Sequence, residues 1–109
     1  MKKIDKPWGH EIIWAETGDY VGKILHINAG HRLSKQFHRV KEETVYVLKG
    51  TLYNYDEHDN IQKFTPGQSF HVSVGQVHRF GANESSVEIV EVSTPHLDDV
   101  VRIEDDYNR

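Results

Sequence analysis

The 109-residue chain contains no cysteine, so neither a disulfide nor a thiolate metal site is available, and any bound metal must take nitrogen and oxygen ligands. It also lacks an apolar run of the length that a membrane-spanning helix needs. With 13 basic against 17 acidic residues there is no basic excess, and the basic residues are scattered among acids. We therefore expect neither membrane insertion nor a continuous positive surface for nucleic acid.

The length and the amino terminus bound the domain organisation. A chain of 109 residues builds one hydrophobic core, and we expect a single domain over residues 1–109. Residues 1–7 carry lysines but lead into Trp8-Gly9-His10-Glu11 and not into an apolar stretch with a cleavage site, so no signal peptide is predicted. A cytoplasmic location is the resulting expectation.

Alternation of apolar and polar residues predicts strands throughout the chain. Val21, Lys23 and Leu25 fall on one side of residues 20–27, which is the period of a strand. Turn signals such as Pro66-Gly67 recur about every 8 to 12 residues, which is typical of an all-β sandwich or barrel. We expect strands over residues 20–27, 33–38, 44–48, 51–55, 61–64, 68–72, 77–80 and 87–92, and a last one in the tail 97–109.

Eight histidines in so short a chain direct attention to metal binding, because imidazole is the commonest metal ligand. Gln36 and His38 are two residues apart, so on a strand both side chains leave the same face. Glu43 begins the next predicted strand and His78 follows the turn at Gly75. These four side chains suit one divalent ion, with Zn as the first expectation and Mn, Fe, Ni or Co as alternatives. The spacing also fits Gln36 and His38 in solvent and His78 as a hydrogen-bonded core residue.

Two motifs resemble those of the cupin superfamily. The first is G-x5-Q-x-H-x4-E-x6-G over residues 30–50, in which Gln36 stands where the family usually has its first histidine. The second is G-x7-G-x2-H over residues 67–78, with Ser73 in place of the usual proline. The resemblance implies an all-β double-stranded β-helix, the small cupin jelly-roll barrel. It also implies the same four metal ligands: Gln36, His38, Glu43 and His78.

The two ends of the chain carry the resemblance further. Residues 6–9 (KPWG), 30–38 (GHRLSKQFH) and 97–109 (LDDVVRIEDDYNR) are similar to segments of the cupin domain of mannose-6-phosphate isomerases. The family's His-His-Arg-Ala-Glu-His-Trp reads Arg-Val-Lys-Glu-Glu-Thr-Val at residues 39–45, without the two histidines and the tryptophan. The resemblance implies a metal-dependent sugar-phosphate isomerase that moves a proton between C1 and C2 of a small sugar phosphate.

Such a reaction needs a base whose pKa is near neutrality, within about 3 Å of the proton. The candidates are His31, His71 and Glu11, and the sequence does not choose among them. Arg102, in the matched tail, is counted with His31 and His71 as a candidate catalytic residue.

The phosphate of such a substrate needs a cation, preferably a bidentate arginine. Arg32 and Arg102 are the first candidates and Lys35 the next, although each equally fits a solvated surface charge. Four aromatic residues are candidates for a sugar pocket, and residues of this kind more often form core or dimer contacts: Trp8, Tyr46, Tyr53 and Phe80.

Two other functions stay open. The loss of histidines after His38 also fits a non-catalytic sugar- or metabolite-binding cupin. An oxygen-using iron cupin is less favoured, because such sites commonly resemble three histidines plus Glu, whereas Gln36 is neutral. A barrel of this size has exposed strand edges, and we expect a homodimer.

Overall fold

Strands account for the regular structure of the computed structural model, which describes residues 1–108. The strands are β1 (Lys2–Lys6), β2 (Gly9–Glu16), β3 (Val21–Ile27), β4 (Lys35–Phe37), β5 (Glu43–Lys49), β6 (Leu52–Tyr55), β7 (Ile61–Phe64), β8 (Ser69–Val72), β9 (Phe80–Gly81), β10 (Val87–Ser93) and β11 (Val101–Glu104). The predicted all-β class is confirmed. Residues 1–108 contain no helix that is long and apolar enough to cross a membrane.

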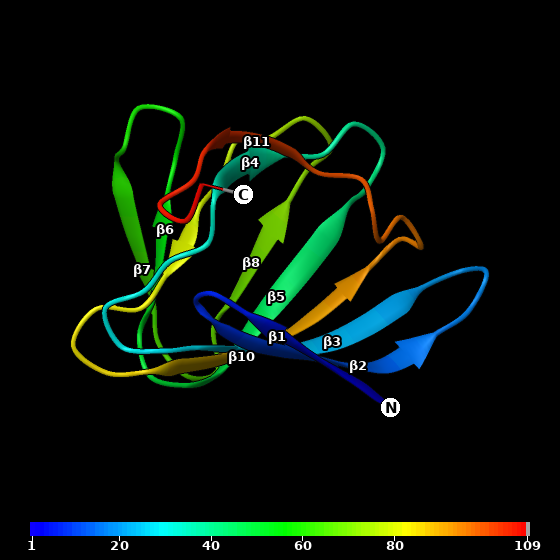
Figure 1. The fold of residues 1–109 in the computed structure, drawn as a ribbon, viewed down its shortest axis with the longest axis horizontal. Helices are drawn as coiled ribbons and strands as arrows, with labels where there is room; N and C mark the ends of the chain where they lie inside the picture. The colour runs from blue at the N-terminus through cyan, green and yellow to red at the C-terminus, as the bar shows by residue number, and fades with distance from the viewer. Residues whose placement is uncertain (109) are drawn as a thin grey trace.

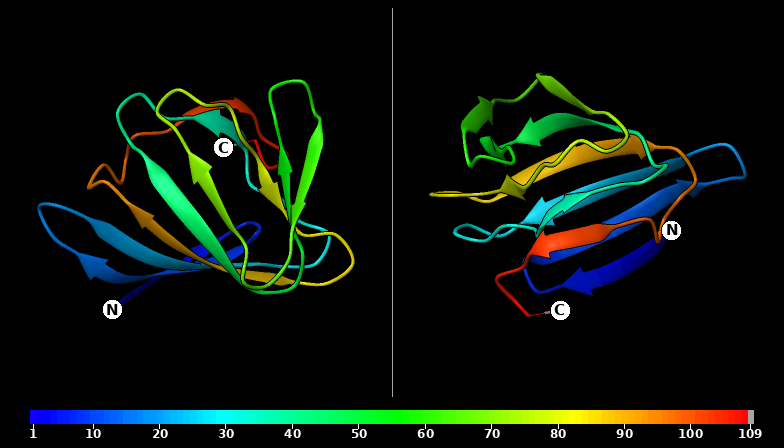
Figure 2. Two further views of the ribbon diagram at one scale, coloured as in Figure 1. Left: turned by 180° about the vertical axis from the view of Figure 1, so that it is seen from behind. Right: turned by 90° about the horizontal axis from the view of Figure 1, so that it is seen from above.

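The strands form one large and two small antiparallel sheets. The large sheet has the order β1-β2-β3-β10-β5-β8, and the small sheets are β11-β4 and β7-β6-β9. In Figure 1 the large sheet curves beneath β4 and β11, while β6 and β7 stand at one end. The views in Figure 2 show the same layers, with β4 and β11 across from the large sheet. The interior of this barrel holds both the hydrophobic core and the polar site.

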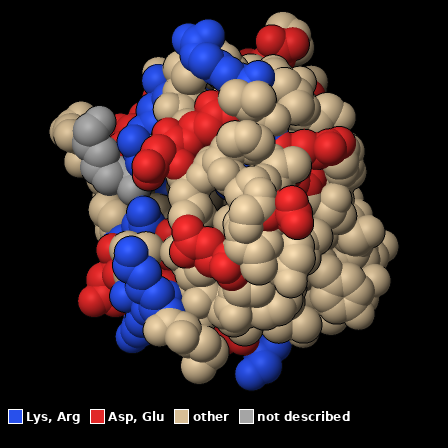
Figure 3. Space-filling view, turned by 90° about the vertical axis from the view of Figure 1, so that its right-hand side faces the viewer, with Lys and Arg blue, Asp and Glu red and all other residues tan. Residues whose placement is uncertain are grey.

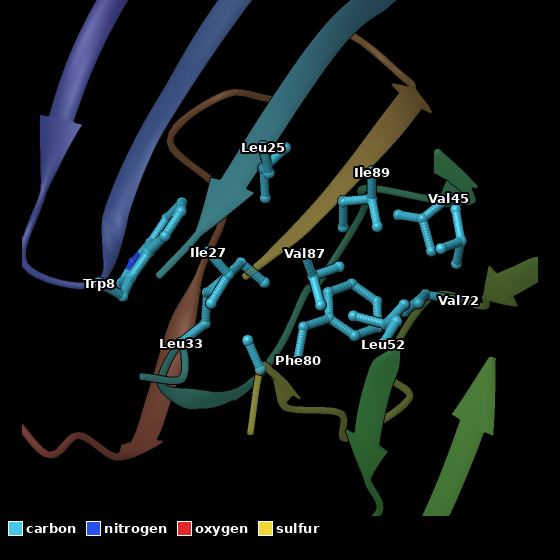
Figure 4. Close-up of a cluster of buried hydrophobic side chains, with 12 residues drawn as sticks. Trp8, Leu25, Ile27, Leu33, Val45, Leu52, Val72, Phe80, Val87 and Ile89 are labelled. Carbon is cyan, nitrogen blue, oxygen red and sulfur yellow. The ribbon is translucent and has the colours of Figure 1, made fainter. Parts of the chain in front are cut away.

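The hydrophobic core joins the sheets. Val87 and Ile89 point inward from β10 and meet Leu52 of β6 and Phe80 of β9 (Figure 4). Trp8 lies at another side of the same cluster and is also buried. Each fully buried side chain of this kind contributes about 1.5–3 kcal/mol. The core therefore gives the neighbouring polar residues a rigid support.

Most predicted strands match the structure closely. β3 to β8 and β10 lie within two residues of their predicted bounds, and β11 is the predicted last strand. The prediction over residues 77–80 is wrong in its bounds, because residue 78 forms an isolated bridge and β9 begins only at residue 80. The predicted tail ends at Arg109, which lies outside the described residues.

The strands β1 and β2 were not predicted. Ile12, Ile13 and Trp14 follow one another without alternation, so the period of a strand is hidden. The structure explains the run, because Ile13 is buried inside while Trp14 lies exposed on the outer face. Gly9, the first residue of β2, has a φ of 152°, and a Cβ there would lie 2.0 Å from the carbonyl O of His26. Only glycine fits this close approach.

Ion pairs hold the carboxyl-terminal segment on the barrel. Arg79 is 1% exposed, and its Nη1 and Nη2 lie 3.4 and 3.0 Å from carboxylate oxygens of Glu104 and Asp106. Arg32 donates two N–H groups to Asp106, at 2.7 and 3.1 Å. The Nζ of Lys35 lies 3.9 Å from an oxygen of Glu104. We call these five residues the tail clamp.

Candidate metal centre

Backbone pairing brings the chain segments of the four predicted ligands together. Gln36 and His78 face each other in an antiparallel bridge, with N to O distances of 3.0 and 2.9 Å, so their side chains leave on the same side. His38 follows β4 and Glu43 opens β5. Ligand atoms of His38, Glu43 and His78 lie within 4.8 Å of one another, and Gln36 and His38 line one pocket with Glu43. We call His38, Glu43 and His78 the ligand triad.

Backbone carbonyls orient both histidines of the ligand triad. The Nδ1 of His38 lies 2.6 Å from the carbonyl O of Asp99, and the Nδ1 of His78 lies 3.1 Å from that of Gln76. Because a carbonyl only accepts, each Nδ1 donates its proton there, and each Nε2 points inward toward Glu43. Both Nε2 atoms are buried without a hydrogen-bond partner, 3.3 and 3.9 Å from Glu43 oxygens. Proteins hold metal-binding histidines in this way.

The surroundings keep Glu43 ionised and His78 neutral. Burial acts to raise the pKa of Glu43, but His38, Lys41 and His78 outweigh it and lower that pKa to about 2. Burial lowers the pKa of His78, although the negative charge of Glu43 opposes the shift. A metal ligand must be deprotonated, so both residues already have the protonation state that binds a cation.

The donor set suits one divalent ion. Two imidazole nitrogens, one carboxylate and the amide oxygen of Gln36 are the ligands that zinc and the neighbouring transition metals accept. A buried polar atom without a partner costs about 1–3 kcal/mol, and two such nitrogens face Glu43 here. A cation bound among them would remove that cost. The residues therefore fit the predicted metal, and zinc stays a prediction among the alternatives.

Buried charges continue from the ligand triad into the barrel. The Nζ of Lys41 lies 3.0 Å from Glu43 and 3.1 Å from Glu91, and the Nζ of Lys23 lies 3.5 Å from Glu11. Burial acts to lower the pKa of Lys41, but the two carboxylates outweigh it and raise that pKa. Burial raises the pKa of Glu91, and the charge of Glu43 adds to the shift.

Of these buried charges only Glu11 and Glu43 were predicted as site residues. Lys23 and Glu91 carried a signal that the prediction did not use. Each occupies a core-facing position of an alternating strand, where an apolar residue is expected. Lys41 lies in a loop, where the sequence pattern gives no sign of burial.

Two residues of the ligand triad, His38 and Glu43, line a pocket of about 120 Å³, and His78 lies behind them with its Nε2 3.9 Å from Glu43. The predicted residues Glu11 and Arg102 line it, together with Lys6 and the aromatic core residues Trp8 and Phe80. Neither Lys6 nor Arg102 forms an ion pair with a carboxylate of residues 1–108, so both charges are available to an anionic ligand. Two aromatic residues predicted for a sugar pocket do not line it: Tyr46 and Tyr53.

Four other predicted site residues belong neither to the ligand triad nor to the lining of the pocket. His71 is exposed on the outer face of the large sheet, with its Nε2 3.0 Å from a carboxylate oxygen of Glu42. The Nδ1 of His31 contacts a backbone carbonyl nearby in the chain. Arg32 is paired with Asp106 of the tail clamp, and the Lys35 Nζ lies 2.8 Å from an Asp59 carboxylate oxygen, so carboxylates neutralise both charges. Their catalytic and phosphate-binding roles stay predictions without support from their positions.

The comparison with known protein families decides the affiliation. Residues 1–105 match the family model described as mannose-6-phosphate isomerase C-terminal. The chain belongs to this family. The predicted resemblance to the cupin domain of mannose-6-phosphate isomerases is thereby confirmed. The match covers nearly the whole chain, although residues 39–45 lack the two histidines and the tryptophan of the family pattern.

Curated relatives carry the mannose-6-phosphate isomerase C-terminal domain as part of longer proteins. The alginate biosynthesis protein AlgA of Pseudomonas aeruginosa is 31% identical over 98% of this chain and 23% of its own length. The xanthan biosynthesis protein XanB of Xanthomonas campestris is 29% identical over 99% of this chain and 24% of its own length. The chain thus spans about a quarter of the length of these relatives.

Solved structures confirm the predicted cupin fold. KdgF from a Halomonas species superposes with a TM-score of 0.78 at 20% identity, over 87% of this chain and 88% of its own. A cupin-like protein from Thermotoga maritima gives 0.78 at 14% identity, over 88% and 76%. A sugar phosphate isomerase of the cupin superfamily from Silicibacter pomeroyi gives 0.70 at 16% identity, over 78% and 58%. At these identities the likeness concerns the fold alone.

The surface in Figure 3 bears on the expectation that the protein binds no nucleic acid. Acidic side chains spread across the middle of this face, and basic side chains lie along its edges. A nucleic-acid backbone needs a continuous basic surface. This face offers none.

Proposed function

We propose that the protein is a metal-dependent sugar-phosphate isomerase of the mannose-6-phosphate isomerase type. The reaction interconverts an aldose phosphate and a ketose phosphate by moving a proton between C1 and C2. The observation that carries the proposal is the pair of buried Nε2 atoms without partners that face Glu43, in a chain of this family. A bound divalent ion would hold sugar oxygens and stabilise the negative charge that develops during proton transfer.

The two unpaired cations of the pocket suit the phosphate. Arg102 on β11 pairs in register with Gln36 on β4, so its side chain leaves the small sheet on the face of that candidate ligand. A guanidinium binds phosphate through two parallel hydrogen bonds. This supports Arg102 as the phosphate-binding residue, with Lys6 as the second cation.

The carboxyl groups of the pocket are the candidates for proton transfer. Glu11 and Glu91 are both buried, whereas the predicted bases His31 and His71 do not line the pocket. A base works best when its pKa lies near the operating pH, and burial shifts the pKa of Glu91 upward in that direction. These observations favour Glu91 over Glu11.

A coupled assay with mannose 6-phosphate tests the proposal. Chelator-treated protein is reloaded separately with zinc, manganese, iron(II), cobalt or nickel, and the formation of the ketose phosphate is followed. A matched histidine pair serves as the control, because His78 belongs to the ligand triad and His71 does not line the pocket. We expect turnover by the wild type and by His71→Leu, and none by His78→Leu. Absence of turnover with every metal would remove the proposal.

A second candidate is a sugar-phosphate-binding protein without catalysis. The observation in its favour is that the two candidate bases are both ion-paired, Glu11 with Lys23 and Glu91 with Lys41. Calorimetric titration with mannose 6-phosphate separates the two functions. Binding to the metal-loaded protein without turnover supports the second candidate, and turnover eliminates it.

We also propose that the protein is a homodimer. Ile12, Ile24, Val90 and Tyr46 are successive cross-strand neighbours on the outer face of the large sheet. Trp14 lies exposed beside this apolar row. Burial of such a face against a second copy would remove apolar surface from water. Light scattering that finds only a 12.6 kDa species would contradict the dimer.

A further inference from the structure

We propose that Asp99 is a positioning residue of the metal centre. Asp99 holds the ligand His38 through its main chain, and it holds the loop between the ligands His38 and Glu43 through its side chain. The inference rests on the proposed metal site. It adds one residue, Asp99, that lies outside the donor set and on which metal affinity also depends.

The main-chain contact fixes the ring of His38. The carbonyl O of Asp99 accepts a hydrogen bond from the His38 Nδ1 at 2.6 Å, and this ring nitrogen has no other acceptor among the described residues. The bond determines which nitrogen carries the proton and where the Nε2 lone pair points. A displacement of Asp99 would therefore free the ring to rotate or to change its tautomer.

The side-chain contacts fix the loop that joins the two ligands. The Asp99 carboxylate accepts the backbone N–H groups of Arg39, Val40 and Lys41, at 3.0, 2.8 and 2.8 Å. These are the three residues that follow His38 directly. Hydrogen bonds to an ionised acceptor are about twice as strong as neutral ones. The loop thus depends on a single carboxylate from a distant part of the chain.

The third residue of that loop carries the effect to Glu43. The backbone N–H of Lys41 binds Asp99, while its Nζ lies 3.0 Å from a carboxylate oxygen of Glu43. Asp99 therefore supports the ligands at both ends of this loop: His38 directly, and Glu43 by way of Lys41. The opposite side of the loop is held by the Gly75 N–H, which donates to the His38 carbonyl at 2.8 Å.

The neighbouring Asp98 makes a matched control. It precedes Asp99, has the same charge, and its side chain makes no hydrogen bond or ion pair among the described residues. Asp106 is a second control, because it belongs to the tail clamp and has no contact with the ligand triad. Asp98→Ala reports the loss of an acid from the tail, and Asp106→Ala reports a weakened tail.

Competition with a chromophoric chelator measures the zinc affinity of the folded variants. Asp99→Ala should bind zinc about 10- to 100-fold more weakly than the wild type, as is typical when an outer hydrogen-bond partner of a ligand is removed. Asp99→Asn keeps one acceptor oxygen and should fall between the two. Asp98→Ala and Asp106→Ala should stay within about twofold of the wild type. If Asp99→Ala is insoluble, the comparison of Asp99→Asn with Asp98→Asn decides in its place.

A spectroscopic measurement separates positioning from a loss of stability. Nitrogen-15 spectra of the histidine side chains in metal-free protein should show His38 protonated at Nδ1 in the wild type and in Asp106→Ala. In Asp99→Ala the two tautomers should mix. Equal zinc affinity and equal His38 spectra in Asp99→Ala and Asp98→Ala would overturn the inference. If the wild type binds no metal, the metal site fails, and the His38 spectra alone then decide the role of Asp99.

Discussion

The tail clamp and the ligand triad are two clusters of charged and polar side chains that differ in how completely their polar atoms are paired. In the tail clamp, the Arg79 Nε donates to the Leu33 carbonyl at 2.9 Å, and both Nη atoms contact carboxylates. In the ligand triad, the Nε2 atoms of His38 and His78 have no partner. A fully paired cluster fastens the structure, whereas a buried cluster with inward lone pairs is complete only with a ligand.

Acid should separate the two clusters. Burial lowers the pKa of His78 below its ordinary 6.5, because the fold favours the neutral ring. The metal-free protein therefore loses stability as the pH falls below 6.5. Over the same range protons compete with the metal for the ring. Hydrogen bonds with backbone N–H groups hold the pKa of Asp99 at about 2, and Arg32 lowers the pKa of Asp106. The stability that these two carboxylates contribute is fully present at pH values above 3.8 and is lost as the pH falls below 3.8.

We therefore expect metal release at a higher pH than unfolding. Equilibrium dialysis reports the bound metal, and circular dichroism reports the fold along the same acid titration. Simultaneous loss of both signals would show that the two clusters are not independent.

The largest single-residue effect is expected at the ligand triad. His78→Leu removes one inward nitrogen of the donor set. Loss of an outer hydrogen-bond partner weakens metal binding by up to about 100-fold, and we expect a larger loss of zinc affinity here. The stability of the metal-free protein should change by less than about 1.5 kcal/mol, because leucine fills a similar volume and leaves no unpaired nitrogen. Chelator competition and urea unfolding measure the two quantities. A large loss of stability without loss of zinc affinity would reverse the roles of the clusters.

Arg79→Met tests the tail clamp. Removal of one partner of a buried ion pair costs about 3–5 kcal/mol, and we expect the lower end because the carboxylates of Glu104 and Asp106 are 57% and 42% exposed. Urea unfolding of the metal-free protein gives the value. The control is Arg39→Met, which removes an exposed arginine and should change stability by less than about 0.5 kcal/mol. Equal stability of the two variants would contradict the structural role of Arg79.

The smallest effects concern one exposed arginine, Arg102, and one half-buried arginine, Arg32. Arg102 has no carboxylate partner among residues 1–108, so Arg102→Met should leave stability unchanged and weaken sugar-phosphate binding about 10- to 100-fold. Arg32 is paired with Asp106, so Arg32→Met should lower stability by less than about 1 kcal/mol and leave binding unchanged. Calorimetry and urea unfolding measure both variants. The opposite pattern would restore Arg32 as the phosphate-binding residue.

The candidate ligands could be proposed from the sequence because local spacing was joined by the resemblance to the two cupin motifs. Gln36 and His38 lie two residues apart, and Glu43 and His78 stand at the starts or ends of short extended pieces between glycine turns. Strand alternation likewise located most of the sheet. The amino-terminal strands escaped prediction because Ile12, Ile13 and Trp14 pack on both faces of the same sheet.

The surroundings of the ligands could not be predicted in the same way. Lys41 and Asp99 act through contacts between segments 58 residues apart in the chain, and no local pattern reports such a contact. Arg32 and Lys35 lie in the matched motif, yet Arg32 pairs with Asp106 of the tail and Lys35 pairs with Asp59 at 2.8 Å. Which cation meets substrate and which meets a carboxylate depends on the docking of the tail, a property of the folded chain.

Metal content is the most direct test of the central claim that His38, Glu43 and His78 hold one divalent ion. Protein purified without chelator, in the wild-type and His78→Leu forms, is analysed by mass spectrometry of its metals. We predict close to one divalent ion per wild-type chain and none above background in His78→Leu. Equal metal content in the two proteins, or none in the wild type even after incubation with each candidate metal, would contradict the account.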